Sequence, residues 1–358
     1  MKGLLKVVLR LLAVSVVAVT LLAFIRTDEW WVRVCDFPRL QIATVGLALL
    51  ILAVGLRGRL RGADRALACC IAAAVVVQMW FIYPYTSLAH EEVRAAVHPS
   101  PGNTLRLFAA NVLMSNRDSA ALLALIRAQD PDVILLTEPD DRWIDECRSL
   151  EATHRFTVLQ PQENTYGMAL YSRLELVEPE VLFRIEPGIP SIRTGLRLLG
   201  GQLIEFHGVH PRPPGGDPPG PRERQDTGPR DAELLLIARE VKGRGGPVVI
   251  AGDFNDVAWS HTSRRLQRIG GLLDPRVGRG LFGTFDARLP LLRYPLDHVF
   301  HTEHFTLAGL RRLPAGGSDH FPMLATLCFE PQTEQPRGVP TPKPSDQQRA
   351  NELVEKER

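Results

Sequence analysis

The sequence predicts an α/β protein: a four-layer sandwich of two packed mixed β-sheets flanked by helices, preceded by three transmembrane helices. Three observations lead to this prediction. The first 85 residues carry three long apolar runs, whereas the remainder has the composition of a globular domain. Residues 105–137 have the pattern of strand, helix and strand, and strands outnumber helices beyond them. Because the strands are apolar throughout, we expect both faces of each sheet to be covered.

The apolar runs at the amino terminus predict a membrane anchor over residues 1–85. They cover Leu11–Ile25, Leu40–Leu56 and Ala66–Tyr83, close to the ~17–25 residues that a spanning helix needs. Aromatic residues stand at the ends of the runs, as at membrane interfaces: Trp30, Trp31, Trp80, Tyr83 and Tyr85. A signal peptide is disfavoured because no small-x-small cleavage pair follows the first run. Buried core helices are the alternative, which three successive runs with basic flanks disfavour.

The distribution of Lys and Arg predicts how these helices are oriented. The amino terminus and the loop 57–65 hold seven basic residues, against four in the first loop and after the third run. The more basic side is expected to face the cytoplasm. We therefore expect a multi-pass protein of the bacterial inner membrane, with the following domain in the periplasm or otherwise outside the cytoplasm.

The rest of the chain divides by composition. Residues 86–104 predict a connector, residues 105–330 a folded domain, and residues 331–358, rich in Pro, Gln and charge, a disordered tail. The net charge of +2 gives no general argument for binding nucleic acid. None of the five cysteines forms a CxxC pair or a zinc spacing, and pairing of Cys147 with Cys328 is left open.

Within the domain, apolar runs and periodicity place the main elements. We expect helices at 118–129 and 232–241, and strands at 105–110, 132–137, 169–172, 203–209, 248–251, 297–300 and 323–328. The Pro- and Gly-rich stretch 211–230 is expected to be either a loop that contacts substrate or a flexible excursion.

Polar residues lie at the ends of the predicted strands, with Asp297 at the start of one strand and Asp319 and His320 before the last one. They are Asn111, Glu138, His210, Asp253, Asn255, Asp297, Asp319 and His320. His210 is preferred to His207 because residues three apart on a strand face opposite ways. Ligands of sheet proteins gather where the carboxyl ends of strands open toward solvent. We therefore expect these side chains to form one pocket.

The residue types in this pocket fit hydrolysis of a phosphate ester. Mg²⁺ or Mn²⁺ prefers oxygen ligands, which can come from Asn111, Glu138 and Asp319. A carboxylate near the attacking water can take its proton, and Asp253 is the candidate. Fixed donors can stabilise charge on the phosphorus oxygens, and the candidates are His210, Asn255 and His320. Asp297 can orient His320 by holding one ring nitrogen.

Seven stretches carry a resemblance to a known family. They are LFAANV (107–112), ILLTE (134–138), TYGMALYSR (165–173), HGVHPRPP (207–214), VVIAGDFND (248–256), PLDHVF (295–300) and GSDHFP (317–322). In this order they resemble the endonuclease/exonuclease/phosphatase superfamily, in its membrane-anchored bacterial branch, and they cover most of 105–330. The family fold is a four-layer α/β sandwich.

The resemblance also implies roles for single residues. Asn111 and Glu138 match metal-site residues, and Tyr166 and Arg173 match positions near the site, with Tyr166 toward phosphate. His210 resembles the histidine that contacts phosphate or protonates the leaving group. The remaining matches align water, bind phosphate or close the site: Asp253, Asn255, Asp297, Asp319 and His320. One departure is Met168, where the family often has Asn after Tyr-Gly.

We therefore predict a membrane-anchored, divalent-metal-dependent phosphoesterase, nuclease-like, that hydrolyses phosphodiester or phosphomonoester bonds with metal- and Asp-activated water. The expected partners are a phosphate ester (nucleic acid, nucleotide or phospholipid) and the bilayer, with no protein partner. Alternatives are a phospholipid head-group hydrolase of the same fold, mildly disfavoured because the 211–230 loop is not apolar, and a non-enzymatic ligand-binding module. A binuclear metallophosphoesterase is set aside because residues 105–135 lack its DxH.

Overall fold

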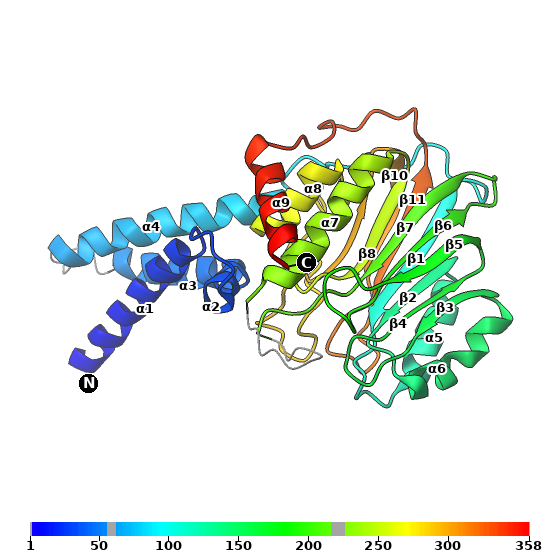
Figure 1. Ribbon diagram of the computed structural model, residues 1–358. Coiled ribbons are helices and arrows are strands. Elements are labelled where there is room, and N and C mark those ends of the chain that lie inside the picture. The colour runs from blue at the N-terminus through cyan, green and yellow to red at the C-terminus, as the bar shows by residue number, and fades with distance from the viewer. Residues whose placement is uncertain (1, 56–61, 216–225, 358) are drawn as a thin grey trace.

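The computed structural model describes residues 2–55, 62–215 and 226–357. Figure 1 shows two parts, a group of apolar helices at the amino terminus and an α/β domain from which they extend. Two stretches used in the predictions fall outside the described residues: 56–61, which hold part of the basic loop, and 216–225, within the Pro- and Gly-rich loop.

Two mixed β-sheets form the centre of the domain. Their strands are β1 Thr104–Asn111, β2 Val133–Thr137, β3 Phe156–Gln160, β4 Met168–Ser172, β5 Glu175–Leu182, β6 Ser191–Arg197, β7 Leu203–Val209, β8 Val248–Asp253, β9 Asp297–His301, β10 Phe305–Arg312 and β11 Met323–Phe329. One sheet has the order β10-β11-β1-β2-β4-β3 and the other β5-β6-β7-β8-β9. Within them β1 pairs with β2, and β7 with β8, in parallel.

Helices cover the outer face of each sheet. The helices are α1 Lys2–Leu22, α2 Trp30–Arg33, α3 Arg39–Gly55, α4 Gly62–Ile82, α5 Ser119–Gln129, α6 Asp141–Cys147, α7 Gly228–Arg244, α8 His261–Gly270 and α9 Pro344–Glu357. Helices α5 and α6 pack on the sheet that contains β1, while α7, α8 and α9 pack on the sheet that contains β8. The two mixed sheets flanked by helices agree with the predicted fold class.

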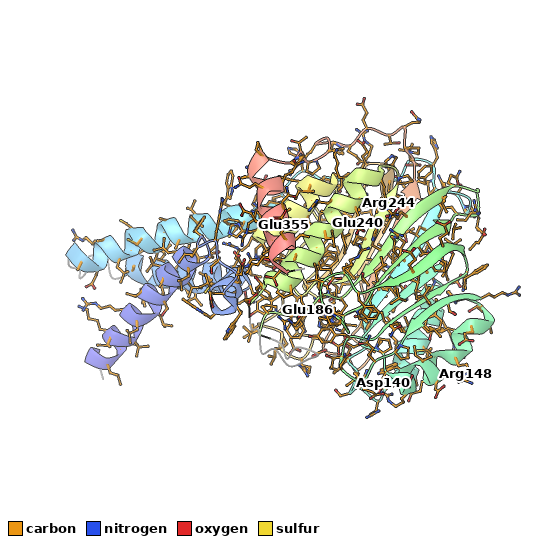
Figure 2. All side chains as sticks on the ribbon, in the orientation of Figure 1. Asp140, Arg148, Glu186, Glu240, Arg244 and Glu355 are labelled. Atoms are coloured by element: carbon orange, nitrogen blue, oxygen red, sulfur yellow. The ribbon has the colours of Figure 1, made fainter. Side chains whose placement is uncertain are left out.

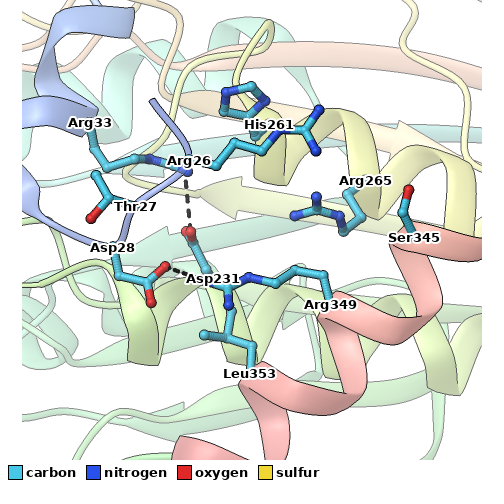
Figure 3. Close-up of a pocket in the computed structure, with 10 residues that line it drawn as sticks. All are labelled: Arg26, Thr27, Asp28, Arg33, Asp231, His261, Arg265, Ser345, Arg349 and Leu353. Carbon is cyan, nitrogen blue, oxygen red and sulfur yellow. Dashed lines mark hydrogen bonds and ion pairs between the residues drawn. The ribbon is translucent and has the colours of Figure 1, made fainter. Parts of the chain in front are cut away.

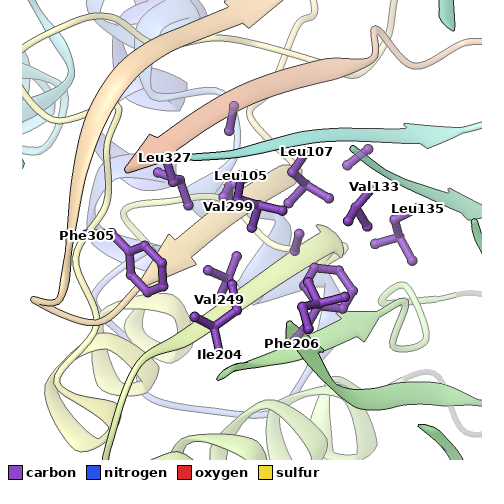
Figure 4. Close-up of a cluster of buried hydrophobic side chains, with 14 of the residues drawn as sticks. Leu105, Leu107, Val133, Leu135, Ile204, Phe206, Val249, Val299, Phe305 and Leu327 are labelled. Atoms are coloured by element: carbon purple, nitrogen blue, oxygen red, sulfur yellow. The ribbon is translucent and has the colours of Figure 1, made fainter. Parts of the chain in front are cut away.

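Alternation along the strands explains why the domain has layers. In β1, Leu105 and Leu107 point into the core between the sheets, which Figure 4 shows, whereas Phe108 and Ala110 point toward α5 and α6. Buried apolar residues therefore occupy both faces of the strand, and its sequence reads as one apolar run. Cys147 and Cys328 are both buried free thiols, so the open pairing is not formed.

The carboxyl-terminal segment corrects the sequence prediction of a disordered tail over 331–358, because residues 344–357 form α9. This helix buries Ala350, Leu353 and Val354 against α7 and α8. Its Asp346 accepts hydrogen bonds from Arg268, at 2.6 and 2.7 Å, and from Arg265. The short apolar stripe and one buried ion pair fix a segment whose composition is mostly polar.

The amino-terminal helices hold two candidate membrane spans, Leu4–Leu22 and Gly62–Tyr85. Segments Trp30–Asp36 and Arg39–Gly55 qualify only together, as a pair bent by 66°. Leu11 is 62 % exposed and Trp80 75 % exposed. Figure 2 shows side chains projecting outward along these helices. Among the described residues the number of spans is thus two, or three with the bent pair, and periplasmic placement remains a prediction.

The anchor and the domain are joined by specific contacts. The Nε1 of Trp259 donates to the carbonyl of Asp36 at 2.7 Å, and the Tyr85 hydroxyl donates to the carbonyl of Ala258 at 3.0 Å. The connector after the last apolar helix also belongs to the domain, because Val93 is fully buried between the sheets. The segment that follows β8 is therefore held by residues of the anchor.

Candidate active site

The carboxyl ends of the parallel strands meet at one edge of the two sheets. In one sheet Asn111 of β1 lies opposite Thr137 of β2, directly before Glu138. In the other, Val209 of β7 lies opposite Gly252 of β8, so that His210 and Asp253 leave the two strands together. The predicted convergence of strand ends is therefore present in the structure.

Asp253 is the centre of this arrangement. Its Oδ2 accepts a hydrogen bond from Asn111 Nδ2 at 3.2 Å. The same oxygen lies 3.5 Å from His320 Nε2 and 3.8 Å from His210 Nε2. All four side chains are buried, each with at most 5 % exposure. One carboxylate oxygen thus connects residues from β1, β7, β8 and the segment before β11.

The Gly-Asp-Phe-Asn turn places Asp253 for backbone reasons. Gly252 has φ of 140°, and a Cβ at this position would lie 1.9 Å from the carbonyl oxygen of Val209, so only glycine fits. After the strand, Asn255 adopts φ of 50°, and its N–H donates to Asp253 Oδ1 at 2.9 Å. Asn255 Nδ2 donates to the carbonyl of Pro211, next to His210. The turn therefore fixes both the carboxylate and the loop beside it.

Asn111 and Glu138 form the second half of the site. Asn111 Nδ2 donates to Glu138 Oε1 at 2.7 Å, while Asn111 Oδ1 accepts from the Leu113 N–H. Glu138 has a positive φ of 67°, which is uncommon for a residue with a side chain. This left-handed turn ends β2 and directs the carboxylate back toward Asn111.

His320 is held from several sides. Its Nδ1 lies 2.8 Å from Asp297 Oδ2, and its backbone N–H donates to Ser318 Oγ. Ser318 in turn donates to the carbonyl of Asn111. The ring of Phe285 lies 4.9 Å from the His320 ring, between centroids. These contacts leave Nε2 directed at Asp253, as the sequence predicted for an oriented histidine.

Burial and neighbouring charge shift the protonation of these groups. Burial raises the pKa of Glu138 to about 7 and also raises the pKa of Asp253. Burial alone would lower the pKa of His320, but Asp297 and Asp253 overcome it and raise that pKa to about 10. Burial lowers the pKa of His210, which Asp253 opposes only in part. At neutral pH His320 is therefore cationic and His210 neutral.

The donor set fits a divalent cation. One atom each of Asp253, Asp297 and His320 lie within 4.8 Å of one another. Since the His320 imidazolium already bridges those two carboxylates, a simpler place for a cation is beside Glu138 and Asn111, where no cationic side chain pairs with the carboxylate in the described residues. Hard cations prefer carboxylate and amide oxygens; the Asn111 amide turns its nitrogen toward Glu138 while its oxygen accepts from the Leu113 N–H, so Asn111 would have to rotate its amide to bind a cation beside Glu138.

Two of the predicted site residues lie apart from this cluster. Arg173 follows β4, which runs antiparallel to β2, so it lies at the opposite end of the strand from Glu138 and pairs with Asp130. The expectation that Arg173 lies near the site is therefore wrong. Asp319 borders the site, but its Oδ2 pairs with Arg288 at 3.2 Å and it is not part of the close group.

Tyr166 lies near the site, with its ring centroid 5.7 Å from that of His210. Met168, which departs from the family pattern, is fully buried between the sheets and so contributes to packing. Sequence reasoning gave no role to Arg230, whose Nη1 donates to the carbonyl of Asn255 at 2.6 Å. Two further residues belong to short sequence stretches that could have pointed to them. Ser318 lies in GSDH (317–320), and Thr284, whose side chain accepts from the Asp297 N–H, lies in GTF (283–285).

Comparison with known proteins agrees with this geometry. The model of the Endonuclease/Exonuclease/phosphatase family matches residues 108–320. UPF0294 protein YE0917 of Yersinia enterocolitica is 38 % identical over 103 residues, 28 % of this chain and 35 % of that protein, so the chain matches about a third of its relative's length.

Solved structures share the fold at low sequence identity. The human nocturnin catalytic domain with bound sulfate has a TM-score of 0.50 and 17 % identity, covering 65 % of this chain and 96 % of that one. A humanized D. rerio TDP2 has a TM-score of 0.49 and 14 % identity, covering 63 % and 98 %. The family match spans more than half of the sequence. The chain therefore belongs to the endonuclease/exonuclease/phosphatase family.

Proposed function

We propose that this protein is a membrane-anchored, divalent-metal-dependent phosphodiesterase whose reaction uses a water molecule activated by Asp253. The observation that carries the proposal is the single oxygen, Asp253 Oδ2, that faces Asn111, His210 and His320 at once. A buried carboxylate with a raised pKa is suited to accept a proton from water near neutral pH. Because it is held by a backbone N–H at its other oxygen, its orientation is fixed before substrate binds.

The two histidines have different tasks in this proposal. His320 is cationic and is fixed by Asp297, so it stabilises negative charge on the phosphorus oxygens. His210 is neutral and buried, and its Nδ1 has no hydrogen-bond partner in the described residues. Its Nε2 can donate to a phosphate oxygen or to the leaving group. Both donors are in place without rearrangement.

A divalent cation would be held by Glu138 and Asn111, and Mg²⁺ or Mn²⁺ is the proposed ion. When bound, it neutralises phosphate charge and favours loss of the leaving alkoxide. Its charge would also offset that of the Glu138 carboxylate, whose pKa of about 7 reflects burial without a cation. Asp319 is proposed to contribute only after its pair with Arg288 opens.

The test uses the full-length protein in detergent, because anchor residues hold the segment after β8. We expect hydrolysis of bis-p-nitrophenyl phosphate with Mg²⁺ or Mn²⁺, none with EDTA, and loss of activity in Asp253→Asn. The matched control is Glu233→Gln, which changes a buried carboxyl of α7 that is away from the site. Activity of Asp253→Asn equal to that of the control would refute the assignment.

A phospholipid head group is a second candidate substrate, and one segment favours it. The residues between Phe285 and Tyr294, which pair as a bridge, form a loop with exposed leucines: Leu289 is 49 %, Leu291 84 % and Leu292 44 % exposed. Phe285 also contacts His320, and Gln41 of α3 donates to the carbonyl of Leu291. The stretch 211–230 is not apolar in sequence. The loop between Phe285 and Tyr294 instead places apolar side chains next to the site and against the apolar helix α3.

This second candidate is tested by comparing substrates. If lipid is the substrate, Leu291→Ser lowers hydrolysis of phospholipid vesicles severalfold while leaving bis-p-nitrophenyl phosphate hydrolysis unchanged. Plasmid DNA is the competing substrate in the same assay. Cleavage of DNA without cleavage of phosphatidylglycerol, phosphatidylcholine or sphingomyelin vesicles would leave the nuclease-like function alone.

A further inference from the structure

A second polar region, in which Arg26 and Ser345 are exposed, lies where the end of α1 meets the domain. It is a cavity of about 210 Å³ lined by the segment after α1, by α8 and by α9 (Figure 3). Four arginines line it, Arg26, Arg33, Arg265 and Arg349, together with His261. We name it the arginine pocket. It is separate from the candidate active site, since its lining residues and those of the site do not overlap.

The carboxylates of the arginine pocket are already engaged. Asp28 pairs with Arg349 at 2.7 Å and with Lys356 at 3.3 Å. Asp231 pairs with Arg230 at 2.7 Å and with Arg33 at 3.5 Å. Figure 3 shows two of these pairs, Asp28 with Arg349 and Asp231 with Arg33, on the side of the pocket away from Arg265 and Ser345. They neutralise Arg33 and Arg349 and leave no carboxylate of the lining for the other two arginines.

Three groups on the other side have one partner or none among the described residues. No hydrogen bond or ion pair joins Arg26 to another described residue, whereas Arg265 contacts Asp346 through Nε only, and Asp346 is shared with Arg268. His261 Nε2 is buried without a hydrogen-bond partner among the described residues. Burial lowers the pKa of His261; Asp36 opposes this effect, while Arg33, Arg26 and Arg265 lower the pKa further. The lining itself holds four arginines and two carboxylates, so its side chains carry a net positive charge.

We infer that the arginine pocket binds a phosphate-bearing anion, either the head group of an acidic phospholipid or a free phosphate. Arg guanidinium groups bind phosphate through paired hydrogen bonds, and they do so more strongly where water is excluded. The hydroxyls of Thr27 and Ser345 line the same cavity and add donors. This inference is independent of the proposed hydrolysis.

The position of the pocket favours the lipid source. Arg26 follows the candidate span Leu4–Leu22 by four residues, and the exposed Trp30 and Trp31 come next along the chain. Tryptophan and arginine at the end of a span lie at the level of the head groups. Acidic head groups in that layer attract basic side chains.

The test measures binding to the full-length chain in detergent with EDTA present, so that the metal site contributes nothing. The probes are dihexanoyl phosphatidylglycerol, dihexanoyl phosphatidylcholine and sodium phosphate, each titrated while the unfolding midpoint is recorded. We expect a saturable rise with phosphatidylglycerol and none with phosphatidylcholine. The double variant Arg26→Gln/Arg265→Gln should weaken that binding at least tenfold, as loss of charge-assisted hydrogen bonds predicts.

Controls separate this site from general charge effects. Arg155→Gln removes an exposed arginine on the other sheet and should bind as the wild type does. If the double variant folds poorly, Arg26→Gln alone serves, because Arg26 has no described partner to leave unpaired. Sodium phosphate could raise the unfolding midpoint as much as phosphatidylglycerol does. If that rise is lost in Arg26→Gln, the bound anion is free phosphate. Unchanged binding in the arginine variants, or an equal rise with phosphatidylcholine, overturns the inference.

Discussion

Two buried charged clusters lie next to each other in this protein, and they differ in how their charges are balanced. The first, the paired cluster, consists of Arg33, Arg230, Asp231 and Asp256, two cations and two anions, with Arg230 bound to Asp231 at 2.7 Å. The second, the site cluster, consists of Glu138, His210, Asp253, Asp297 and His320. Its three carboxylates face only one imidazole that is held as a cation.

The difference indicates what each cluster does. Buried ion pairs whose charges cancel need no bound ion to balance them, and they hold together the segments that carry them. In the paired cluster those segments are α2 of the anchor and the turn after β8. A buried cluster with excess negative charge is costly unless a cation or protons balance it. The excess negative charge of the site cluster therefore favours a bound cation, although its Glu138 is only half-buried while the four side chains of the paired cluster are buried.

The largest effect should come from removing the balancing histidine of the site cluster. His320→Ala takes away the charge that faces Asp253 and the group fixed by Asp297, and we expect kcat/KM to fall by about 10²–10⁴. The free energy of unfolding should fall as well, because His320 pairs with Asp253 and Asp297 of other strands, so activity is compared in protein that denaturant titrations show to be folded. Wild-type activity in the folded fraction of His320→Ala would make His320 a structural residue only.

The paired cluster should respond in the opposite manner. Arg33→Met leaves Asp231 and Asp256 with only Arg230, and we expect a loss of about 3 kcal/mol in the free energy of unfolding. Arg26→Met is the matched control, because Arg26 pairs with no described residue, and its effect should stay within about 0.5 kcal/mol. Guanidinium titrations followed by tryptophan fluorescence measure both. Equal stability of the two variants would remove the distinction between the clusters.

The site cluster could be predicted from the sequence because its residues follow strands. Asn111, Glu138, His210 and Asp253 leave the carboxyl ends of parallel strands, and this rule needs no knowledge of the distant fold. The family resemblance, which placed Arg173 near the site, was wrong there because β4 runs antiparallel to β2 and its carboxyl end lies away from the site. The prediction was incomplete for Asp319, whose pairing with Arg288 depends on a loop of irregular structure.

The paired cluster and α9 were not predicted, for a related reason. Arg33 donates a hydrogen bond to Thr262, which lies 229 residues away in the sequence. The local sequence around either residue does not predict this contact. In α9, three apolar residues and the Asp346 pair outweigh a polar composition. Contacts of this kind are set by tertiary packing. Sequence patterns therefore predict the strands of the sheets better than the contacts that the amino-terminal helices and α9 make with the domain.

Metal binding should separate the two clusters further, because the cation is expected to bind at the site cluster and not at the paired cluster. With Mg²⁺ or Mn²⁺ at about 100 times Kd, binding to the native state adds about 2.7 kcal/mol to the free energy of unfolding. Glu138→Gln should lose most of this gain, whereas Arg33→Met should keep it on its lower baseline. Unfolding midpoints of the wild type and the two variants, each with and without EDTA, give the six values needed. A gain that survives in Glu138→Gln would place the cation elsewhere.

The smallest effect should be the pH dependence of stability in EDTA, where the clusters have opposite signs. Burial raises the pKa of Glu138 from 4.5 to about 7, so the native state binds more protons than the unfolded state in that window, and stability falls by roughly 1–3 kcal/mol as the pH rises through it.

Burial would raise the pKa of Asp231, but Arg230 and Arg33 hold it below 3.8, so its contribution is present above that pH and is lost as the pH falls. Denaturant titrations across this range should show that Glu138→Gln flattens the slope between about pH 4.5 and 7. Asp231→Asn should change only the acid limb, since the wild-type carboxylate is fully ionised above it. Both carboxyls are shielded from water, but only Asp231 has guanidinium partners. If the two variants showed the same dependence of stability on pH, charge balance would not distinguish the clusters.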